Sequence, residues 1–271
     1  MSDRRLTPAN GRVAALHLAG QVEAARYVEG APAMIGAALA DLCASPGGPR
    51  DRQLLPGAAV AVFENRAGWS FVQAADGYVG YLRSDALGAV SAPSHFVASV
   101  ATHAYAQEDF KSPDLHHLPF GARVTVLDER RNFFETNLGF VPKRHLRRLD
   151  RPFEDPATAA QLHFGVPYLW GGNSTRGIDC SGLIAAALRA CDIPCPADSD
   201  MQHARLGQPF EGGYQRGDLL FWQGHVGMMV DHETMIHANA HHMATVYEPI
   251  EQAILRIKAQ GDGAVTGRRR L

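Results

Sequence analysis

The chain is organised around the stretch Gly177-Ile178-Asp179-Cys180-Ser181-Gly182-Leu183-Ile184. An apolar run rich in alanine and leucine continues from it to Ala190. Because Asp179 is a good N-cap residue and alanine and leucine favour helices, we expect a helix whose first turn contains Cys180. The unpaired N–H groups and the dipole of a helix start favour an anion, so this position biases the thiol toward the nucleophilic thiolate. A lone cysteine is more often a small buried apolar residue, so a catalytic role needs support from elsewhere in the chain.

The composition limits the possible partners. With 271 residues, 46% of them hydrophobic and 20% charged, the chain has the make-up of a globular protein with two or three domains. Its formal net charge of -2 gives no field that attracts nucleic acid or an anionic membrane, and we expect neither as a partner. We expect the basic tail Arg268-Arg269-Arg270 to be a solvated terminus.

We predict the cellular location by looking for membrane-spanning and secretory signals in the sequence. No apolar run is long enough to cross a bilayer. The first residues are polar, and the short apolar run over residues 13–19 is interrupted by His17 and has no clear cleavage site. We see no secretory signal and therefore expect a cytoplasmic protein. We expect no disulfide scaffold either, because a chain of this length has only four cysteines: Cys43, Cys180, Cys191 and Cys195.

The first half of the chain contains a weak internal repeat. Residues 54–63 align without gaps on residues 118–127, and Gly77-Tyr78-Val79 matches Gly139-Phe140-Val141. Each copy alternates apolar and polar residues in short runs that are separated by Gly, Asn and Asp. This is the pattern of half-buried strands, which we expect in the first copy over residues 60–62, 69–72 and 78–81. The repeat predicts two small β-barrels.

The repeat and the composition together divide the chain into four parts. We expect an N-terminal strap over residues 1–32, a first barrel over 33–92, a second barrel over 93–150 and a C-terminal domain over 151–271. The strap is predicted to contain one helix, from Gln21 to Val28. In the first barrel, a Trp followed by a strand and by Asp76-Gly77-Tyr78-Val79-Gly80-Tyr81 resembles bacterial SH3-like domains, and the second barrel shows the same order more weakly.

Helical patterns precede strand patterns in the C-terminal domain, after a charged linker that ends at Pro156. We predict helices over residues 158–163, from Cys180 onward and after Asp198 or Ser199, and strands over residues 218–222, 225–230 and 235–238. Helices first and a sheet afterwards is an α+β arrangement.

Two histidines are candidate partners for the Cys180 thiol. A thiolate nucleophile needs a base, and the base needs a third group that fixes its ring. His225 is the first residue of a predicted apolar strand. Its side chain would lie at the end of the sheet, where it can contact the N-terminus of a helix. His237 lies in the next predicted strand, so antiparallel pairing would bring the two imidazoles within bonding distance. The chain has 13 histidines, so either one alone is better explained as an ordinary core or surface residue.

Five blocks of sequence, taken together, resemble the NlpC-type cell-wall peptidases, which are papain-like cysteine peptidases of bacterial peptidoglycan. The blocks are Tyr168-Leu169-Trp170-Gly171-Gly172, Gly177-Ile178-Asp179-Cys180-Ser181-Gly182-Leu183, Arg216-Gly217-Asp218-Leu219-Leu220-Phe221, Gly224-His225-Val226-Gly227 and Ile236-His237-Ala238. They occur in the family's order, and the combination is far more specific than any one block. The resemblance implies a papain-like domain in which the helix bearing the cysteine packs on an antiparallel sheet.

The resemblance also implies a role for individual residues. Cys180 would be the nucleophile, His225 the base and His237 the third member, and the hydroxyl of Tyr168 would help to hold the oxyanion. In relatives, the positions that line the substrate cleft correspond here to Trp170, Asp179, Ser181 and Ser199. Asp179 and Ser199 are explained equally well as residues that start helices.

Two SH3-like barrels ahead of such a domain resemble the γ-D-glutamyl-L-diamino-acid endopeptidases. The resemblance implies substrates such as L-Ala-γ-D-Glu-diaminopimelate, or the peptide with lysine, that carry a free N-terminal L-Ala. It implies no cofactor and no metal. With no leader in view, we expect a role in murein peptide recycling.

The group that would read the free amine is left open by the sequence. A carboxylate is the natural partner of an ammonium group, and the first barrel is the part that reads it in relatives. The position after Gly57, where we expect an acid, is Ala58. Glu64 and Asp76 are alternatives, and Tyr81 is a candidate for lining the cleft.

Other functions remain as alternatives. A metal site built from Cys191, Cys195, His241 and His242 has suitable residue types, but the spacing fits no compact four-ligand pattern. An amidase or an acyltransferase on the same fold would use the same three residues. A non-catalytic wall-binding protein is disfavoured because Cys180, His225 and His237 are all present.

Overall fold

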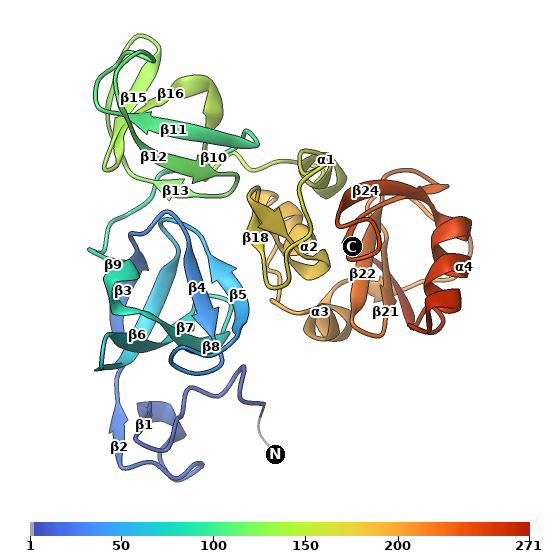
Figure 1. Ribbon diagram of the computed structural model, residues 1–271, viewed down its shortest axis with the longest axis horizontal. Helices are drawn as coiled ribbons and strands as arrows, with labels where there is room; N and C mark the ends of the chain where they lie inside the picture. The colour runs from blue at the N-terminus through green and yellow to red at the C-terminus, as the bar shows by residue number, and fades with distance from the viewer. Residues whose placement is uncertain (1–2) are drawn as a thin grey trace. The chain divides into compact units, whose positions relative to one another are not determined.

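The computed structural model describes residues 3–271, and its contacts divide them into two compact units (Figure 1). Unit 1 contains the described residues up to Val97, together with Thr102–Leu118 and Ala122–Leu146. Unit 2 contains Ala98–Ala101, Pro119–Gly121 and Arg147–Leu271. The four domain ranges drawn from the sequence stay predictions.

The first barrel is a seven-stranded sheet with the order β5-β4-β8-β7-β6-β3-β9 (Figure 1). Its strands are β3 (Ala31–Ile35), β4 (Ala40–Cys43), β5 (Arg50–Leu54), β6 (Ala59–Arg66), β7 (Trp69–Ala74), β8 (Val79–Arg83) and β9 (Leu87–Gly88). The three predicted strands correspond to β6, β7 and β8 and are confirmed. Ala67 and Gly68, both with positive φ, form the two-residue turn that joins β6 to β7, which matches the twist of a tight hairpin.

The predicted helix from Gln21 to Val28 is wrong. The segment contains a turn and then β2 (Arg26–Val28), which pairs in parallel with β1 (Val13–Ala15). The residues of β1 are almost fully buried, so the backbone of β1 needs a hydrogen-bonding partner that a separate helix would not supply. Tyr27 and Val28 also favour strand conformation. Within residues 3–32, the helical structure is limited to the short 3-10 helix η1 (Leu16–Leu18).

The second barrel follows the internal repeat strand by strand. It consists of β10 (His95–Val97), β11 (Ala101–Tyr105), β12 (Asp114–Pro119), β13 (Arg123–Val124), β14 (Val126–Glu129), β15 (Phe133–Thr136), β16 (Gly139–Pro142) and β17 (Leu146–Arg148). The two copies end alike, in a 3-10 turn and a short strand: η2 (Ser84–Ala86) and β9 in the first, η3 (Lys143–His145) and β17 in the second. The predicted repeat is therefore visible in the structure.

Unit 2 is built on a six-stranded sheet with the order β20-β25-β21-β22-β23-β24. Its strands are β20 (Gln208–Pro209), β21 (Leu219–Trp222), β22 (His225–Met229), β23 (Thr234–Asn239), β24 (Ala244–Pro249) and β25 (Gly267–Arg270), with a separate pair of β18 (Asn173–Ser174) and β19 (Gly177–Ile178). The helices are α1 (Pro156–Gln161), α2 (Cys180–Ala190), α3 (Ser199–Arg205) and α4 (Ile250–Gln260). No helix in the described part of the chain has the length and apolar character that a membrane span requires.

The sheet of unit 2 lies between helices (Figure 1). Ile250, Ala253 and Ile257 of α4 pack on buried side chains of one face, such as Leu220 and Met235. The helix α2 contacts β22 and β23 and lies on the side opposite α4 in Figure 1. The start of α2 is thereby held at the sheet.

The predicted solvated tail is wrong as well. Residues 267–270 form β25, which pairs with β21 in the middle of the sheet. Arg270 donates from Nη2 to Oδ2 of Asp218 at 2.7 Å, and Asp218 is only 1% exposed. A buried carboxylate is costly without a cationic partner, so the arginine is drawn into the sheet instead of remaining in solvent.

Candidate active site

The helix start predicted at Cys180 is present. Asp179 has an extended backbone and caps α2 through Oδ1, which accepts the N–H of Gly182 at 2.7 Å. Cys180 is the first helical residue and is 7% exposed. Its Sγ lies 3.8 Å from the carbonyl oxygen of Gly224, the residue directly before His225. The chain therefore brings the thiol to the beginning of the strand that carries the candidate base.

Asp179 also ties the loop before it to the helix. Its Oδ2 accepts the N–H of Gly171 at 2.9 Å, and its Oδ1 accepts the hydroxyl of Ser181 at 3.1 Å. Burial raises the pKa of Asp179, and these hydrogen bonds offset part of that shift. Gly182 has no room for a side chain, because a Cβ there would lie 2.4 Å from the carbonyl oxygen of Gly172. Asp179 is thus a helix cap, while a role in lining the cleft stays a prediction.

Tyr168 lies at the opposite end of this loop. Its N–H donates to the carbonyl oxygen of Met243 at 2.9 Å, and its backbone forms a bridge with Ile178. Burial raises the pKa of its phenol well above the ordinary value, and the charges of Cys180 and Asp179 add to the shift. The hydroxyl therefore keeps its proton at neutral pH and is a hydrogen-bond donor near Cys180. That is the property an oxyanion donor needs.

His225 and His237 lie beside each other on neighbouring antiparallel strands, as expected. Nε2 of His225 is 2.9 Å from Nδ1 of His237, and the ring centroids are 5.1 Å apart at an angle of 61°. The register pairs Met228 with Ile236, which puts Gly227 opposite His237, where a Cβ would collide with the side chain of Met235. With Nε2 occupied by His237, Nδ1 is the nitrogen of His225 that is left for Cys180.

Two residues that the sequence analysis missed lie behind His237. Glu248 Oε2 is 2.9 Å from Nε2 of His237, and Arg256 donates from Nε to Oε1 at 2.8 Å and from Nη2 to Oε2 at 2.7 Å. Glu248 belongs to β24 and Arg256 to α4, two elements that we did not predict. A signal was present in Thr245-Val246-Tyr247, directly before Glu248, because β-branched and aromatic residues favour strands.

The charges of the site differ from the sequence prediction of a thiolate. Burial raises the pKa of the Cys180 thiol to about 12, with a further contribution from Asp179, and the N–H groups of Val226 and Ser181 only partly offset it. Burial also lowers the pKa of His225 to about 3, with a further contribution from His237. Both groups are therefore neutral at pH 7. The effect of the helix start is real but smaller than the effect of burial.

The remaining predicted site residues are dispersed. Trp170 is 70% exposed, and Ser199 is the first residue of α3. The helix α3 is linked to the first turn of α2, because Gln202 donates from Nε2 to the carbonyl oxygen of Ser181 at 2.9 Å. Tyr81 belongs to unit 1. Cleft-lining roles for Trp170, Ser181, Ser199 and Tyr81 stay predictions.

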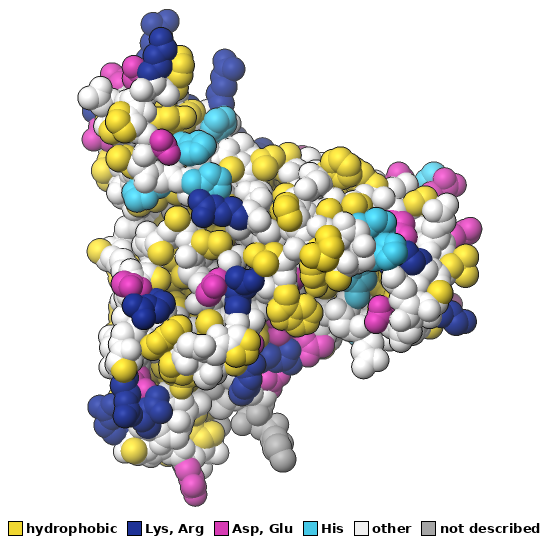
Figure 2. Space-filling view, in the orientation of Figure 1, with side chains coloured by type: hydrophobic (Ala, Val, Ile, Leu, Met, Phe, Trp, Pro, Cys, Tyr) yellow, Lys and Arg dark blue, Asp and Glu magenta, His cyan; other side chains and the backbone are white. Residues whose placement is uncertain are grey.

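One group of potential metal ligands is found in the part of the chain that the structure describes. Side-chain ligand atoms of His237, His242 and Glu248 lie within 4.8 Å of one another. Arg256 already binds both oxygens of Glu248, so a cation there would compete with a guanidinium. The predicted set with Cys191 and Cys195 does not form such a group within residues 3–271. Figure 2 shows histidine side chains at the surface of unit 2, next to hydrophobic ones.

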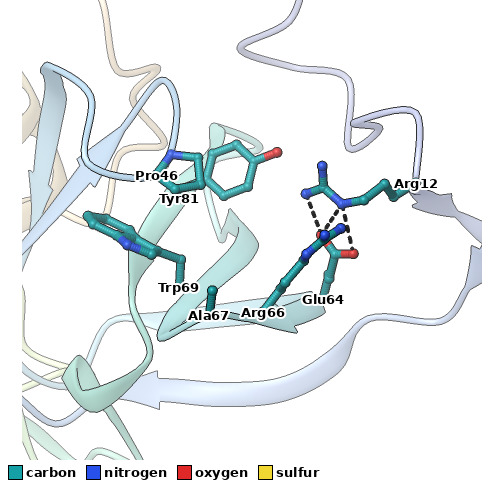
Figure 3. Close-up of a pocket in the computed structure, with 7 residues that line it drawn as sticks. All are labelled: Arg12, Pro46, Glu64, Arg66, Ala67, Trp69 and Tyr81. Carbon is teal, nitrogen blue, oxygen red and sulfur yellow. Dashed lines mark hydrogen bonds and ion pairs between the residues drawn. The ribbon is translucent and has the colours of Figure 1, made fainter.

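The first barrel has a pocket of its own, with a volume of about 170 Å³ (Figure 3). Trp69 and Tyr81 line it, together with Arg12 and Glu64, which are joined by an ion pair of 2.7 Å. Asp76, the second candidate for reading an amine, forms an ion pair with Arg52. Both candidate acids are therefore already bound to arginines.

Comparison with protein families supports the two-part organisation. Residues 165–257 match the NlpC/P60 family, and residues 42–87 match the bacterial dipeptidyl-peptidase Sh3 domain. A γ-D-glutamyl-L-lysine dipeptidyl-peptidase of Bacillus subtilis is 36% identical over 94 residues, which are 31% of this chain and 31% of the relative. A probable endopeptidase p60 of Listeria seeligeri is 37% identical over 84 residues, which are 29% of this chain and 16% of the relative. The chain thus spans less than half the length of these relatives.

A solved structure agrees with the fold of the whole chain. A crystal structure of an NlpC/P60 family protein from Bacillus cereus has a TM-score of 0.75 and covers 89% of this chain and 99% of that one, at 20% sequence identity. At this identity the likeness shows the fold. The chain therefore combines an NlpC/P60 domain of papain-like fold with an SH3-like domain of the bacterial dipeptidyl-peptidase type.

Proposed function

We propose that this chain is a cysteine peptidase that hydrolyses the bond between γ-D-glutamate and the diamino acid in peptidoglycan stem peptides. The observation that carries the proposal is the 2.9 Å contact of His225 with His237 at the sheet end where the Cys180 thiol lies. A nucleophile, a base and a group that orients the base are the parts that acyl transfer requires. The names of the relatives support the same class of reaction.

The first half of the reaction forms a thioester. The Cys180 sulfur attacks the carbonyl carbon of the γ-glutamyl amide while the thiol proton moves to Nδ1 of His225. Because the pKa of the thiol is raised and that of the imidazole is lowered, the proton transfer is expected to accompany S–C bond formation instead of preceding it. The C–N bond then breaks, and the leaving amine takes the proton from His225.

The second half releases the acyl group. A water molecule gives a proton to His225 as its oxygen attacks the thioester carbon. The C–S bond breaks, and the sulfur regains the proton, which restores neutral Cys180 and His225. In both tetrahedral intermediates we expect the hydroxyl of Tyr168, which keeps its proton, and the N–H groups at the start of α2 to donate to the oxyanion.

The proposed substrates are L-Ala-γ-D-Glu-diaminopimelate and the corresponding lysine peptide with a free N-terminal amine. The support is the match of residues 42–87 to the dipeptidyl-peptidase Sh3 domain and the relatives that are named γ-D-glutamyl-L-lysine dipeptidyl-peptidases. We further propose that such small peptides, as they arise in cytoplasmic murein recycling, are preferred over the intact wall.

Mass spectrometry of the products tests the proposal. Purified protein is incubated with L-Ala-γ-D-Glu-diaminopimelate, its N-acetylated form and an intact muropeptide. We expect L-Ala-D-Glu and free diaminopimelate from the first substrate, no product from the acetylated form and slow turnover of the muropeptide. Cys180→Ala should abolish cleavage, whereas His241→Ala, a change at an exposed histidine, should not.

Other results would overturn parts of the proposal. Cleavage at a different amide, or transfer of the acyl group to an added amine, would point to an amidase or an acyltransferase on the same fold. Equal turnover by Cys180→Ala would remove the catalytic assignment altogether. Rapid cleavage of the acetylated peptide would show that the free amine is not recognised.

A further inference from the structure

We propose that Glu248, held in place by Arg256, is a positioning residue that fixes the tautomer of His237 and thereby decides which nitrogen of His225 is basic. The inference rests on the proposed function, because it assigns a role to groups behind the Cys180–His225 pair. It names two residues outside the five sequence blocks from which the site was predicted.

The geometry forms a continuous chain of contacts. Arg256 binds both oxygens of Glu248, at 2.8 and 2.7 Å. Glu248 contacts Nε2 of His237 at 2.9 Å, and Nδ1 of His237 contacts Nε2 of His225 at 2.9 Å. His237 is completely buried and Glu248 is 8% exposed, so water does not compete for these bonds. Nδ1 of His237 therefore faces His225, and Nε2 faces Glu248 and Asn239.

The proton positions follow from the carboxylate. Burial alone would raise the pKa of Glu248, but the hydrogen bonds from Arg256 and His237 outweigh it and lower the pKa. Ionised Glu248 can only accept, so Nε2 of His237 carries the proton. Nδ1 of His237 then has a lone pair and accepts from Nε2 of His225. This leaves Nδ1 of His225 without a proton and able to take the one from Cys180.

Asn239 favours the opposite arrangement. Its Oδ1 accepts the N–H of His242 at 2.9 Å, which turns its amide nitrogen toward Nε2 of His237 at 3.1 Å. An amide donor at that position would favour an unprotonated Nε2. The carboxylate is closer and charged, and charge-assisted hydrogen bonds are the stronger ones, so Glu248 determines the outcome. If Glu248 loses its charge, the amide of Asn239 should determine the tautomer and leave Nε2 of His237 unprotonated.

The charged groups around the two rings act in opposite directions. The carboxylate of Glu248 raises the pKa of His225, whereas Arg256 and His237 lower it. His242, at the turn after β23, lowers the pKa of His237. Cys180, at the start of α2, is neutral at pH 7, because burial raises the pKa of its thiol. Changing Glu248 or Arg256 should therefore shift the titration of His225 in opposite senses.

The direct test is nitrogen-15 NMR of histidine-labelled protein, with signals assigned by His225→Gln and His237→Gln. We expect Nε2–H on His237 in the unchanged chain and Nδ1–H on His237 in Glu248→Gln. The matched control is Glu251→Gln, which makes the same substitution at an exposed position at the start of α4. The same tautomer in the unchanged chain and in folded Glu248→Gln would overturn the inference.

Kinetics provide the second readout. We expect Glu248→Gln to lower kcat/KM by about 10- to 100-fold with little change in KM, as is common when a group that orients a reacting residue is lost. The acidic limb of its pH profile should move to lower pH, whereas in Arg256→Met it should move to higher pH. General damage to the fold would not give shifts of opposite sign, and shifts of the same sign or none would contradict the inference.

Failure of the positioning role can be distinguished from failure of the proposed function. The NMR result does not depend on turnover, so the tautomer can be read in a chain that cleaves no peptide. If Cys180→Ala retains activity, the proposed function fails whatever the tautomer is. If Cys180→Ala is inactive while Glu248→Gln keeps the tautomer and the pH profile of the unchanged chain, only the positioning role fails.

Discussion

Glu64 in the first barrel and Glu248 in unit 2 are both bound through two oxygens by an arginine, yet they belong to different kinds of environment. The side chain of Arg12, the partner of Glu64, is 43% exposed, and the ion pair lies at the edge of the pocket in Figure 3. The side chain of Arg256 is 18% exposed, and Glu248 has a further partner in the fully buried His237.

The comparison teaches that the identity of the third partner makes the difference, since this partner is Asn10 for Glu64 and His237 for Glu248. The Glu64 side chain is only 9% exposed but its arginine is 43% exposed, so solvent at the guanidinium weakens a pair that holds the segment around Arg12. The pair of Glu248 is connected through His237 to His225, the proposed base. An Arg–Glu ion pair holds a chain segment in place in unit 1, whereas in unit 2 it orients a carboxylate toward His237.

Removing His225, the last residue in the series of contacts from Arg256 through Glu248 and His237, should have the largest effect. His225→Ala removes the group that moves every proton in the proposed reaction, and general acid–base groups contribute about 10²- to 10⁴-fold in rate. We expect kcat to fall by at least that factor, measured as product formed from the free tripeptide. The exposed pair offers the contrast, since Arg12→Met should leave kcat unchanged. Retention of kcat in His225→Ala would show that another base acts.

Removing the hydroxyl of Tyr168, the proposed oxyanion donor, should have the next largest effect. Tyr168→Phe deletes only the hydroxyl, and loss of one oxyanion donor costs about 10²- to 10³-fold in kcat. KM should change little, because the bond is formed mainly in the transition state. Tyr247→Phe is the matched control, as its hydroxyl is bonded to Gln161. If both variants have the same kcat as the unchanged chain, Tyr168 is only a packing residue.

His163 sharpens the comparison because it is a buried histidine that contacts a backbone carbonyl and an aromatic ring instead of a carboxylate. It is 1% exposed, its Nδ1 donates to the carbonyl oxygen of Ala159 at 3.2 Å, and its ring meets Phe120 edge-on. Burial lowers its pKa from the ordinary 6.5 to about 4. Between these pH values the unfolded state binds more protons than the folded state. The contribution of His163 to the stability of unit 2 is therefore fully present above pH 6.5 and is lost as the pH falls toward 4.

The measurement is urea unfolding over this pH range. His163 should contribute a slope of up to about 1.4 kcal/mol per pH unit to the free energy of unfolding. His163→Leu should be less sensitive to acid by that amount, whereas His241→Leu, a change at an exposed site, should keep the slope of the unchanged chain. Equal slopes in the unchanged chain and His163→Leu would contradict the assignment.

Breaking the ion pair between Arg12 and Glu64 should have the smallest effect on stability and activity. Glu64→Gln is expected to lower the free energy of unfolding of unit 1 by less than about 1 kcal/mol. Because Arg12 and Asn10 already bind the carboxylate, KM for the free tripeptide should be unchanged. A rise in KM for the free peptide but not for the acetylated one would instead make Glu64 the reader of the amine.

The sequence predicted the parts of the site that have local signals. Asp179 before a run of helix formers marks a helix start, and two apolar strands that each carry a histidine predict a cross-strand pair. Both were found. The strands of the first barrel were equally visible, because alternation and turn residues depend only on neighbours in sequence.

Features that depend on tertiary contacts were missed or wrong. The thiolate prediction failed because burial, which the sequence does not show, outweighs the helix start at Cys180. The role of Glu248 needs the pairing of β23 with β24 and the packing of α4, and neither is a local property. The same holds for Arg270, whose place in the sheet is set by the buried Asp218.

The central claim is that Cys180 is the nucleophile, and alkylation with mapping of the modified residue tests it most directly. The protein is treated with iodoacetamide in steps, and modified cysteines are quantified by peptide mass spectrometry next to the remaining peptidase activity. The account predicts that activity falls in proportion to the modification of Cys180 and is independent of Cys43, Cys191 and Cys195. Full activity in protein whose Cys180 is completely alkylated would contradict it.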